Sequence, residues 1–330
     1  MKETLLCCRI TAQEKGLYRL CHDGVEQAAQ VSGKFQYEAL GPSDYPTVGD
    51  EVLADLNGGG QAVIHKVLPR KSLFLRKAAS TAQEEQPVAA NVDILFLCMA
   101  LNNDFNLRRL ERYLAAAWNS GATPVVVLTK ADLCGNPSEK VAAVEEAAPG
   151  TDVLLTSAAQ EDGIRSLLPY LTPGRTVAFV GSSGVGKSTL MNGLLGKEIL
   201  ATGGLRNDDR GRHTTTRRQM FFLPGGAALI DTPGMRELGL WDSESGLETA
   251  FADIEALARQ CRFQDCRHGQ EPGCAVRAAL ESGELSEERF RSWQRLLAEN
   301  RFADDRSAHL SAKEKKFRMI AQTNKNNAKH

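Results

Sequence analysis

The pattern of hydrophobic and polar positions divides the chain into parts of different structure. Up to residue 77 the apolar runs are short and broken by Gly, Pro and Asp, as in Gly16–Leu20 and Ala62–Leu68. Several short strands with close turn signals predict a small β-barrel. An OB-fold is the most economical barrel for residues 1–77. Residues 78–90 begin polar and rich in small side chains, which predicts a linker.

Residues 91–240 alternate continuous apolar runs with helical spacing. Val92–Leu101 and Thr123–Leu128 are apolar almost throughout, which is typical of strands covered on both faces. Between them, Leu107–Trp118 has its apolar residues three and four positions apart, as in a helix. The alternation continues with an expected helix, strand, helix and strand over 138–147, 152–156, 163–170 and 176–180. This order predicts a parallel, doubly wound α/β sheet.

Helical spacing dominates residues 241–330, where we expect helices over Gly246–Gln260, Ala275–Ser282 and Ser286–Glu299. Ser286 is followed by two glutamates, which fits an N-cap with an acidic first turn. From Lys313 onward the sequence is rich in Lys, Asn and Gln. Such a basic tail suits contact with a phosphate backbone, and the alternative is a terminus that only adds solubility.

Charge and hydropathy exclude some functions. The 330 residues have a formal net charge of −1, so a nucleic-acid surface would have to come from local patches. One such basic patch is formed by Lys66, Arg70, Lys71, Arg76 and Lys77, although charges there could equally protect a strand edge. No apolar stretch reaches the length of a membrane span, and residues 1–10 lack a secretory core. We therefore expect a cytoplasmic protein.

A glycine-rich motif follows the expected strand 176–180. The residues from Gly181 to Ser188 match G-x-x-x-x-G-K-S, with Gly186 and Lys187 at the fixed positions. In such a P-loop, backbone N–H groups and the helix N-terminus surround phosphate oxygens. Lys187 would reach the β- and γ-phosphates, and Ser188 would ligate Mg²⁺. The alternative is a glycine-rich turn before an ordinary helix.

A second motif, Thr129-Lys-Ala-Asp132, resembles the guanine-specificity motif Asn-Lys-x-Asp of GTPases. Guanine presents N1–H and N2–H₂ as adjacent donors, and the carboxylate of Asp132 can accept both, while Lys130 can lie over the ring. Thr129 replaces the usual Asn, which we expect to weaken tethering of the loop but to leave base reading intact. Ser157-Ala158, at the end of the next strand, resembles the motif that supports the same base. The alternative is a charged loop between strand and helix.

Two further segments resemble the switches of a GTPase. Thr202–Arg218 is polar and would be switch I, with Thr216 as the first candidate for the threonine that senses Mg²⁺ and the γ-phosphate, and Thr215 as the second. Asp231-Thr-Pro-Gly234 is a D-x-x-G motif. In it Asp231 would hold Mg²⁺ through water, and the Gly234 N–H would contact the γ-phosphate.

The residues expected to position the attacking water differ from those of Ras-like GTPases. Met235 stands where Ras-like enzymes carry a water-orienting Gln, so we expect slow intrinsic hydrolysis that a partner accelerates. His213 is a candidate to orient or deprotonate the water, and the alternative is an ordinary exposed residue. Along the chain the base motif precedes the P-loop and the switches follow it, which is a circular permutation of the common order. The permutation leaves the site intact because all these loops lie at the carboxyl edge of one sheet.

Four potential metal ligands lie within fourteen positions: Cys261, Cys266, His268 and Cys274. Three thiolates and one imidazole complete a closed tetrahedral Zn²⁺ site with no open position, which indicates a structural role. The alternative is a chance cluster. The other cysteines are scattered, and we expect them to be reduced: Cys7, Cys8, Cys21, Cys98 and Cys134.

Together, the barrel, the permuted motif order and the C-x4-C-x-H-x5-C segment resemble the ribosome small-subunit-dependent GTPase A family of bacteria (RsgA, also called YjeQ). The resemblance covers nearly the whole chain. It implies an α/β fold: a circularly permuted P-loop GTPase domain with a doubly wound sheet, an N-terminal OB-fold barrel and a C-terminal α-helical zinc-binding domain. We accordingly expect the OB-fold at 1–77, the linker at 78–90, the GTPase domain at 91–240, and the zinc domain with its basic tail at 241–330.

The resemblance also implies a function and a set of ligands. Family members bind the small (30S) ribosomal subunit and its 16S rRNA during late maturation, and the subunit stimulates GTP hydrolysis, which drives release. The implied zinc, one per monomer, is held by the three cysteines and the histidine. Nucleotide is held by the positions that match Thr129, Lys130, Ala131, Asp132, Gly181, Ser182, Ser183, Gly184, Val185, Gly186, Lys187, Ser188 and Thr189.

We expect water to attack the γ-phosphate with help from Lys187, Gly234 and Mg²⁺ held by Ser188 and Thr216. The sequence leaves two other functions open. A P-loop ATPase or kinase would share the phosphate loop but would not need Asp132. A non-enzymatic RNA-binding module could keep the nucleotide site without turnover.

Overall fold

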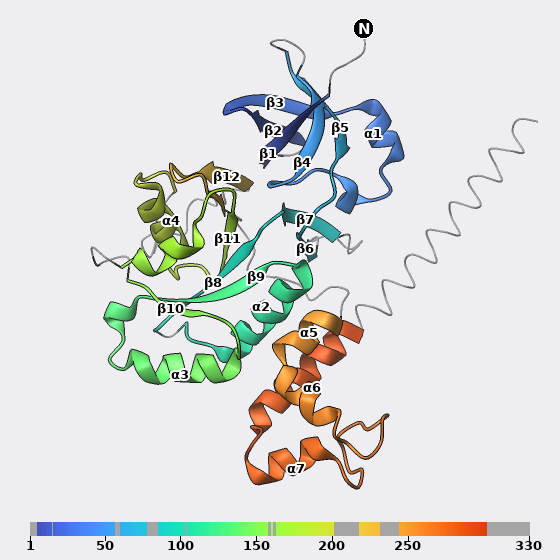
Figure 1. Cartoon of the computed structure of the whole chain (residues 1–330), viewed down its shortest axis with the longest axis vertical. Helices are drawn as coiled ribbons and strands as arrows, with labels where there is room; N and C mark the ends of the chain where they lie inside the picture. The colour runs from blue at the N-terminus through green and yellow to red at the C-terminus, as the bar shows by residue number, and fades with distance from the viewer. Residues whose placement is uncertain are drawn as a thin grey trace, which may run out of the picture. The chain divides into compact units, whose positions relative to one another are not determined.

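The computed structural model describes residues 5–14, 16–56, 60–77, 85–102, 104–157, 160, 163–200, 218–231 and 244–301. The chain forms two compact units, Met1–Gly239 and Leu240–His330. The first contains a barrel and an α/β sheet, and the second is helical (Figure 1).

The first five strands form the predicted barrel. They are β1 (Leu6–Glu14), β2 (Leu17–His22), β3 (Val25–Val31), β4 (Glu51–Asp55) and β5 (Ala62–Val67). Their order is β1-β2-β3-β5-β4, and β4 pairs back onto β1, so the barrel closes. Alternating side chains such as Ile10, Leu20 and Ile64 are fully buried inside it. A short helix, α1 (Gly33–Glu38), follows β3 and begins where the Ser32 hydroxyl accepts a hydrogen bond from the Phe35 N–H.

The predicted linker is partly wrong. Residues 85–90 form a strand, β7 (Glu85–Ala90), which pairs antiparallel with β6 (Leu73–Lys77) in a separate two-stranded sheet. Val88, Ala89 and Ala90 are at most 1% exposed, so these small apolar side chains belong to the interior. Composition predicted a linker because small residues are common in loops, and only the three-dimensional packing shows that they are covered.

The α/β sheet is doubly wound, as expected. Its elements are β8 (Ile94–Ala100), α2 (Leu107–Ser120), β9 (Thr123–Thr129), α3 (Pro137–Ala147), β10 (Val153–Leu155), β11 (Thr176–Val180), α4 (Lys187–Leu195), β12 (Arg218–Phe222) and β13 (Ala228–Asp231). The strand order is β10-β9-β8-β11-β13-β12, and only β12 runs antiparallel to its neighbour. The chain steps outward from β8 to β10, returns to β11 and then continues in the other direction. In open α/β sheets of this kind, the ligand crevice lies at such a reversal, here between β8 and β11, at the carboxyl ends of the strands.

Both faces of this sheet are covered. On one face Phe96 and Phe179 pack edge to face, with ring centroids 5.2 Å apart, and Leu190 and Met191 of α4 join the same core. On the other face α2 lies against β8 and β9, with α3 beside it (Figure 1). The expected helix over 163–170 is a 3₁₀ turn, Arg165–Tyr170, that contains Pro169. Proline lacks the N–H that a longer helix would use.

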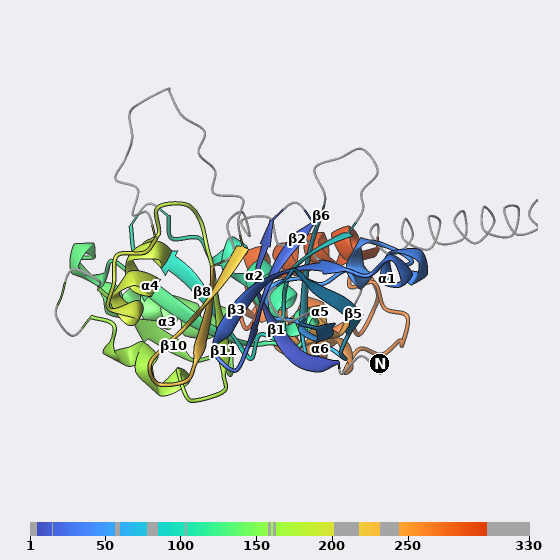
Figure 2. The same ribbon diagram turned by 90° about the horizontal axis from the view of Figure 1, so that it is seen from above.

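The barrel continues directly into the α/β sheet (Figure 2). Strand β1 pairs with β12 through Ala12↔Gln219 and Gln13↔Arg218, so eleven strands form one hydrogen-bonded sheet. The buried guanidinium of Arg218 donates to the Pro87 carbonyl at 2.6 Å and to the Gln13 side chain at 3.2 Å. Arg9 of β1 donates to the hydroxyl of Thr176, the first residue of β11, at 2.7 Å. The barrel therefore also contacts the amino end of the P-loop strand.

One residue of the expected basic patch has a structural role instead. Arg70 forms two hydrogen bonds with Asp50, at 2.7 and 2.8 Å, and the Asp50 side chain is fully buried. Arg70 also donates to the carbonyls of Ser43 and Tyr45, which fixes the loop before β4. A guanidinium committed to a buried carboxylate is not available to a phosphate backbone, so this part of the patch prediction is wrong.

The second unit is built from short helices. Its elements are α5 (Glu244–Ala250), α6 (Ala252–Ala258), α7 (Ala275–Ser282) and the helical residues 287–301. The expected single helix over 246–260 breaks at Phe251, whose side chain is fully buried. Arg289 lies over the Phe251 ring and forms two hydrogen bonds with Asp253, at 2.6 and 2.7 Å. Ser286 is the predicted N-cap, since its hydroxyl accepts from the Arg289 N–H.

None of the helices within the described ranges is both long enough and apolar enough to cross a bilayer.

Candidate functional site

The P-loop has the backbone geometry of a phosphate cradle. Gly181, Gly184 and Gly186 all have positive φ, at 148°, 77° and 102°, which only glycine adopts without strain. A Cβ on Gly181 would lie 2.3 Å from the Cys98 carbonyl oxygen, so the loop also needs glycine to approach β8 this closely. Lys187 then begins α4, which places the helix N-terminus at the end of the loop.

Lys187 and Asp231 provide the charges of the phosphate region. The Lys187 ammonium donates to the carbonyls of Gly181 and Ser182, both at 2.7 Å, so the lysine folds back over the loop. Asp231 ends β13, which runs parallel to the P-loop strand with Ala178 opposite Ile230. Burial raises the pKa of Asp231, and the charge of Lys187 opposes that rise. A bound cation would therefore stabilise the carboxylate further.

The base motif follows β9, which lies two strands away from the P-loop strand β11, and both strands end at the same edge of the sheet. Thr129 ends β9, and Lys130 has a left-handed backbone with φ of 55°, which turns the chain so that Asp132 follows. The Ser157 hydroxyl donates to a carboxylate oxygen of Asp132 at 2.5 Å. The Ala131 N–H donates to the Thr156 carbonyl at 3.2 Å and joins the motif to the end of β10. The structure thus brings the two predicted base segments together.

Thr129 ties the base loop to the P-loop. Its hydroxyl donates to the carbonyl of Val185 in the P-loop at 2.6 Å, and both residues are buried. The base loop is therefore tethered to the phosphate loop without an asparagine. That threonine tethers the loop more weakly than asparagine would stays a prediction.

Two residues with a part in this arrangement were missed by the sequence analysis. Gly163 closes the loop that carries Ser157, since the Ser157 N–H donates to its carbonyl at 3.2 Å. Asn192 on α4 accepts from the N–H groups of Ile199 and Leu200, which fixes the chain just before the expected switch I. A glycine in a loop and an asparagine in a helix give no distinctive sequence signal. Only the contacts identify them.

Several predicted residues lie outside the described part of the chain. They are Ala158, His213, Thr215, Thr216, Gly234 and Met235, together with the basic tail from Lys313. Their assigned roles stay predictions.

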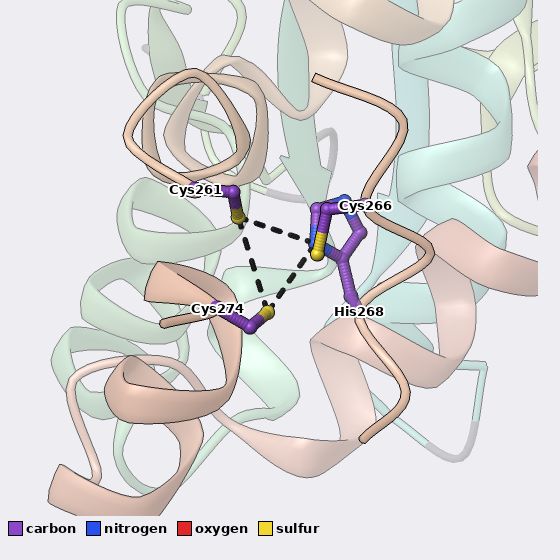
Figure 3. Close-up of side chains that lie close together, drawn as sticks. All are labelled: Cys261, Cys266, His268 and Cys274. Carbon is purple, nitrogen blue, oxygen red and sulfur yellow. Dashed lines mark hydrogen bonds between the residues drawn. The ribbon is translucent and has the colours of Figure 1, made fainter. Parts of the chain in front are cut away.

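The four expected metal ligands converge in the second unit. One ligand atom from each of Cys261, Cys266, His268 and Cys274 lies within 4.8 Å of the others (Figure 3). The two sulfurs of Cys261 and Cys274 are 3.9 Å apart, and His268 Nδ1 is 3.6 and 3.5 Å from them. A tetrahedral Zn²⁺ with ordinary bond lengths would separate two sulfurs by about 3.8 Å and a sulfur and a nitrogen by about 3.6 Å. The cluster therefore has the dimensions of a zinc site.

Local structure prepares His268 and Cys261 for a metal. Burial lowers the pKa of His268, which favours a neutral imidazole that is able to ligate. Burial would raise the pKa of Cys261, but hydrogen bonds from the N–H groups of Val276 and Ala275 at the start of α7, together with those of the Cys274 and Cys266 thiols, lower that pKa. For Cys266, the His268 N–H lowers the pKa, but burial and the neighbouring thiols raise it to about 11 in the metal-free cluster. Cys274 caps the same helix by accepting from the Arg277 N–H at 3.4 Å. The indole of Trp293 lies 5.7 Å from the His268 ring and shields it.

Comparison with known families decides the assignment. Residues 67–241, more than half of the chain, match the model described as "RsgA GTPase". The chain belongs to the RsgA GTPase family. It is a circularly permuted GTPase, as the motif order predicted, and it hydrolyses GTP.

Similar proteins extend the RsgA match over most of the chain. "Small ribosomal subunit biogenesis GTPase RsgA 2" of Lactiplantibacillus plantarum is 51% identical over 292 residues, which are 88% of this chain and 82% of that protein. "Small ribosomal subunit biogenesis GTPase RsgA" of Methanosarcina acetivorans is 46% identical over 91% of this chain and 81% of its own length.

Solved structures agree with the RsgA fold. YjeQ from Thermotoga maritima is 27% identical, has a TM-score of 0.67, and is matched over 90% of this chain and 98% of its own. YloQ, described as a circularly permuted GTPase, has a TM-score of 0.63 at 22% identity over 92% of this chain and 96% of its own, and shows the fold alone.

A second family model matches a shorter part of the chain. Residues 166–329 match a model described as "ABC transporter". That range contains the P-loop, which ATPases and GTPases share, but excludes the base motif at Thr129–Asp132. The match is therefore compatible with membership of the RsgA family.

Proposed function

We propose that this GTPase binds the small (30S) ribosomal subunit through its 16S rRNA, assists late maturation of the subunit, and leaves after GTP hydrolysis. Its relatives are named for small-subunit biogenesis, which supports the proposal. The observation that carries the nucleotide part is the hydrogen bond from Thr129 to Val185, which joins a guanine-reading loop to a phosphate loop. The protein would act as a monomer in the cytoplasm, where ribosomal subunits mature.

Asp132 selects the base. Its carboxylate would accept from both N1–H and N2–H₂ of guanine, and adenine offers no such pair of donors. The Ser157 hydroxyl already fixes one oxygen of this carboxylate, so little side-chain entropy would be lost on binding. Ala158 would support the base from its backbone, and Lys130 would cover the ring.

The P-loop binds the phosphates. N–H groups of the residues from Ser182 to Thr189 would surround the phosphate oxygens. Lys187 would exchange its two carbonyl partners for β- and γ-phosphate oxygens. Ser188 and Asp231 offer the oxygen donors that Mg²⁺ prefers, with Thr216 as the third. When bound, Mg²⁺ neutralises charge that develops on the phosphates.

Hydrolysis needs a positioned water. We assign the Gly234 N–H to the γ-phosphate and His213 to the orientation of the attacking water. Met235 has no hydrogen-bond donor and only a weakly accepting thioether, so turnover without the ribosomal subunit is slow. The subunit would accelerate the step by positioning the segments that carry His213 and Gly234 against the γ-phosphate.

The second unit would carry one structural Zn²⁺. Cys261, Cys266, His268 and Cys274 would hold it, and the ion supplies cross-links between α6, the intervening loop and α7. All four positions are filled by protein, so zinc takes no part in the hydrolysis.

Phosphate release measured with and without purified 30S subunits tests the function. We expect multiple turnover with GTP, at least tenfold faster with 30S subunits, and no such stimulation by 50S subunits. Loss of all turnover in Lys187→Ala would identify this site as its source. Equal rates with and without 30S subunits would refute the ribosomal assignment.

Two nucleotide tests separate the alternatives. Asp132→Asn should lose GTP affinity and gain affinity for xanthosine triphosphate, whose C2 oxygen accepts from an amide. A P-loop ATPase would instead bind ATP in competition with GTP and ignore this substitution. A vestigial RNA-binding module would bind GTP without multiple turnover.

A further inference from the structure

Backbone hydrogen bonds join Ser157, Gln160 and Gly163 in a closed ring. The Gln160 N–H donates to the Ser157 carbonyl at 3.0 Å, and the Gly163 N–H donates to the Gln160 carbonyl at 3.0 Å. The Ser157 N–H then donates to the Gly163 carbonyl at 3.2 Å, which completes the ring. Both ends of Ser157 are therefore held by residues further along the same loop.

Gly163 is the point at which this ring tolerates no side chain. A Cβ built there would lie 1.6 Å from the Ser157 carbonyl oxygen and 2.5 Å from its carbonyl carbon. It would also lie 3.1 Å from the Gln160 carbonyl oxygen. The nearest atoms belong to the backbone, so no rotamer change could relieve the contact. Unlike the P-loop glycines, Gly163 does not have a positive φ, and the requirement is steric alone.

Ser157 transmits this constraint to the base motif. It is 3% exposed, and its hydroxyl donates to Asp132 at 2.5 Å. The carbonyl of the preceding Thr156 accepts from the Ala131 N–H. A displaced Ser157 would pull its hydroxyl away from the carboxylate and disturb the neighbouring backbone contact. The side chain of Asp132 is otherwise exposed and would lose its orientation.

We propose that Gly163 is a positioning residue for guanine recognition, which acts through Ser157 on the carboxylate of Asp132. The inference rests on the proposed role of Asp132 in reading guanine. Gly163 does not touch the nucleotide. It allows the ring to close, and the closed ring presents the hydroxyl that fixes the carboxylate before the base arrives.

Inosine diphosphate provides the readout, because it keeps the N1–H of GDP but lacks the 2-amino group. A hydrogen bond from that amino group to a charged acceptor gives GDP an advantage of about 10- to 100-fold in Kd. In Gly163→Ala the ratio of the Kd for IDP to the Kd for GDP should fall by about tenfold or more. A variant that is only less stable would weaken both nucleotides alike and leave the ratio unchanged.

The experiment measures Kd for GDP and IDP by calorimetry on the full-length, zinc-loaded protein. Gly135→Ala is the matched control, because Gly135 follows the base motif, has no positive φ and has open space around it. Its ratio should equal that of the wild type. Ser157→Ala should lower the ratio, and adding it to Gly163→Ala should lower the ratio no further, because both act through one hydroxyl.

An unchanged ratio in Gly163→Ala, or a double variant in which the two effects add, would overturn the proposal. If Gly163→Ala does not fold, amide exchange of the nucleotide-free wild type decides. The Ser157 and Gly163 amides should be protected there, and exchange at unstructured rates would overturn the inference. A wild type that does not prefer GDP to IDP would instead refute guanine reading by Asp132.

Discussion

The hydrogen bond between Thr129 and Val185 makes a prediction that separates nucleotide binding from folding. Thr129→Val keeps the shape and β-branching of the side chain but replaces the hydroxyl with a methyl group. Thr129 is 3% exposed and Val185 is 1% exposed, so no bulk water replaces the lost donor. The 2.6 Å bond to the Val185 carbonyl disappears, and the base loop is no longer tied to the P-loop by a side chain.

The expected cost has two parts. A carbonyl left unsatisfied in the interior costs about 1–3 kcal/mol of the free energy of unfolding. If the two loops of the nucleotide-free variant separate, water reaches the Val185 carbonyl and that cost becomes smaller. Binding would then restore the buried, unpaired carbonyl. The cost of the unpaired carbonyl is then larger in the GDP-bound variant than in the free variant. If these two costs differ by the net value of one hydrogen bond, about 0.5–1.5 kcal/mol, GDP binds about two- to tenfold more weakly.

Equilibrium binding of GDP and urea unfolding of the free protein measure the two parts. Thr11→Val is the control, since the Thr11 hydroxyl is also fully buried and donates to a carbonyl, that of Arg19, but lies in the barrel. We expect Thr11→Val to lose stability with unchanged GDP affinity, and Thr129→Ser to keep the affinity. If Thr129→Val loses stability and binds GDP as tightly as the wild type, the tether has no part in nucleotide binding.

Three further substitutions test other contacts. Gly181→Ala places a Cβ 2.3 Å from the Cys98 carbonyl oxygen and should weaken GDP binding by more than about 100-fold, whereas Gly225→Ala, which has open space, should not; equal Kd values would contradict the steric argument. Cys274→Ser should lower zinc content and destabilise the second unit, measured by metal analysis and circular dichroism, while Cys134→Ser should retain one zinc. Burial would raise the pKa of Asp253, but its hydrogen bonds to Arg289 hold that pKa below the usual range. The pair therefore stabilises the fold fully above the unfolded pKa of about 3.9, and this stabilisation is lost as the pH falls through the lower folded pKa. Asp253→Asn should therefore cost about 1–2 kcal/mol in urea unfolding at pH 7, discounted for partial exposure, and a difference that does not shrink in acid would contradict the assignment.

The sequence indicates a candidate site wherever chemistry demands particular residues at a fixed spacing. Phosphate binding needs glycines and a lysine at set positions, and guanine needs a carboxylate after a strand, so Lys187 and Asp132 could be found without a structure. The four zinc ligands are similar, because a closed tetrahedral site requires four donors within a short loop. Gly163 and Asn192 act through backbone contacts, which depend on where the chain folds back and leave no periodic signal.

The fold was predictable to the extent that local pattern determines it. Alternating apolar runs indicated the parallel sheet and the barrel, since burial on one or both faces imposes a period on the sequence. The errors occurred where long-range packing overrides local preference. Ala89 and Ala90 of β7 are buried, although their composition is typical of a loop. The predicted single helix breaks at Phe251, whose buried ring packs beneath Arg289.

The strand order explains why permutation preserves the site and also where the barrel is attached. Strands β8 to β10 carry the base motifs on one side of the reversal, and β11, β13 and β12 carry the phosphate motifs on the other. Cutting and rejoining the chain changes which half comes first but not which loops meet at the crevice. The barrel strand β1 pairs with β12, the edge strand of the phosphate half, and β12 directly follows the segment expected to be switch I. The barrel is therefore joined to the half of the sheet that we expect to bind the γ-phosphate, and in the sheet order β12, β13 and the P-loop strand β11 separate it from the strands that carry the base motifs.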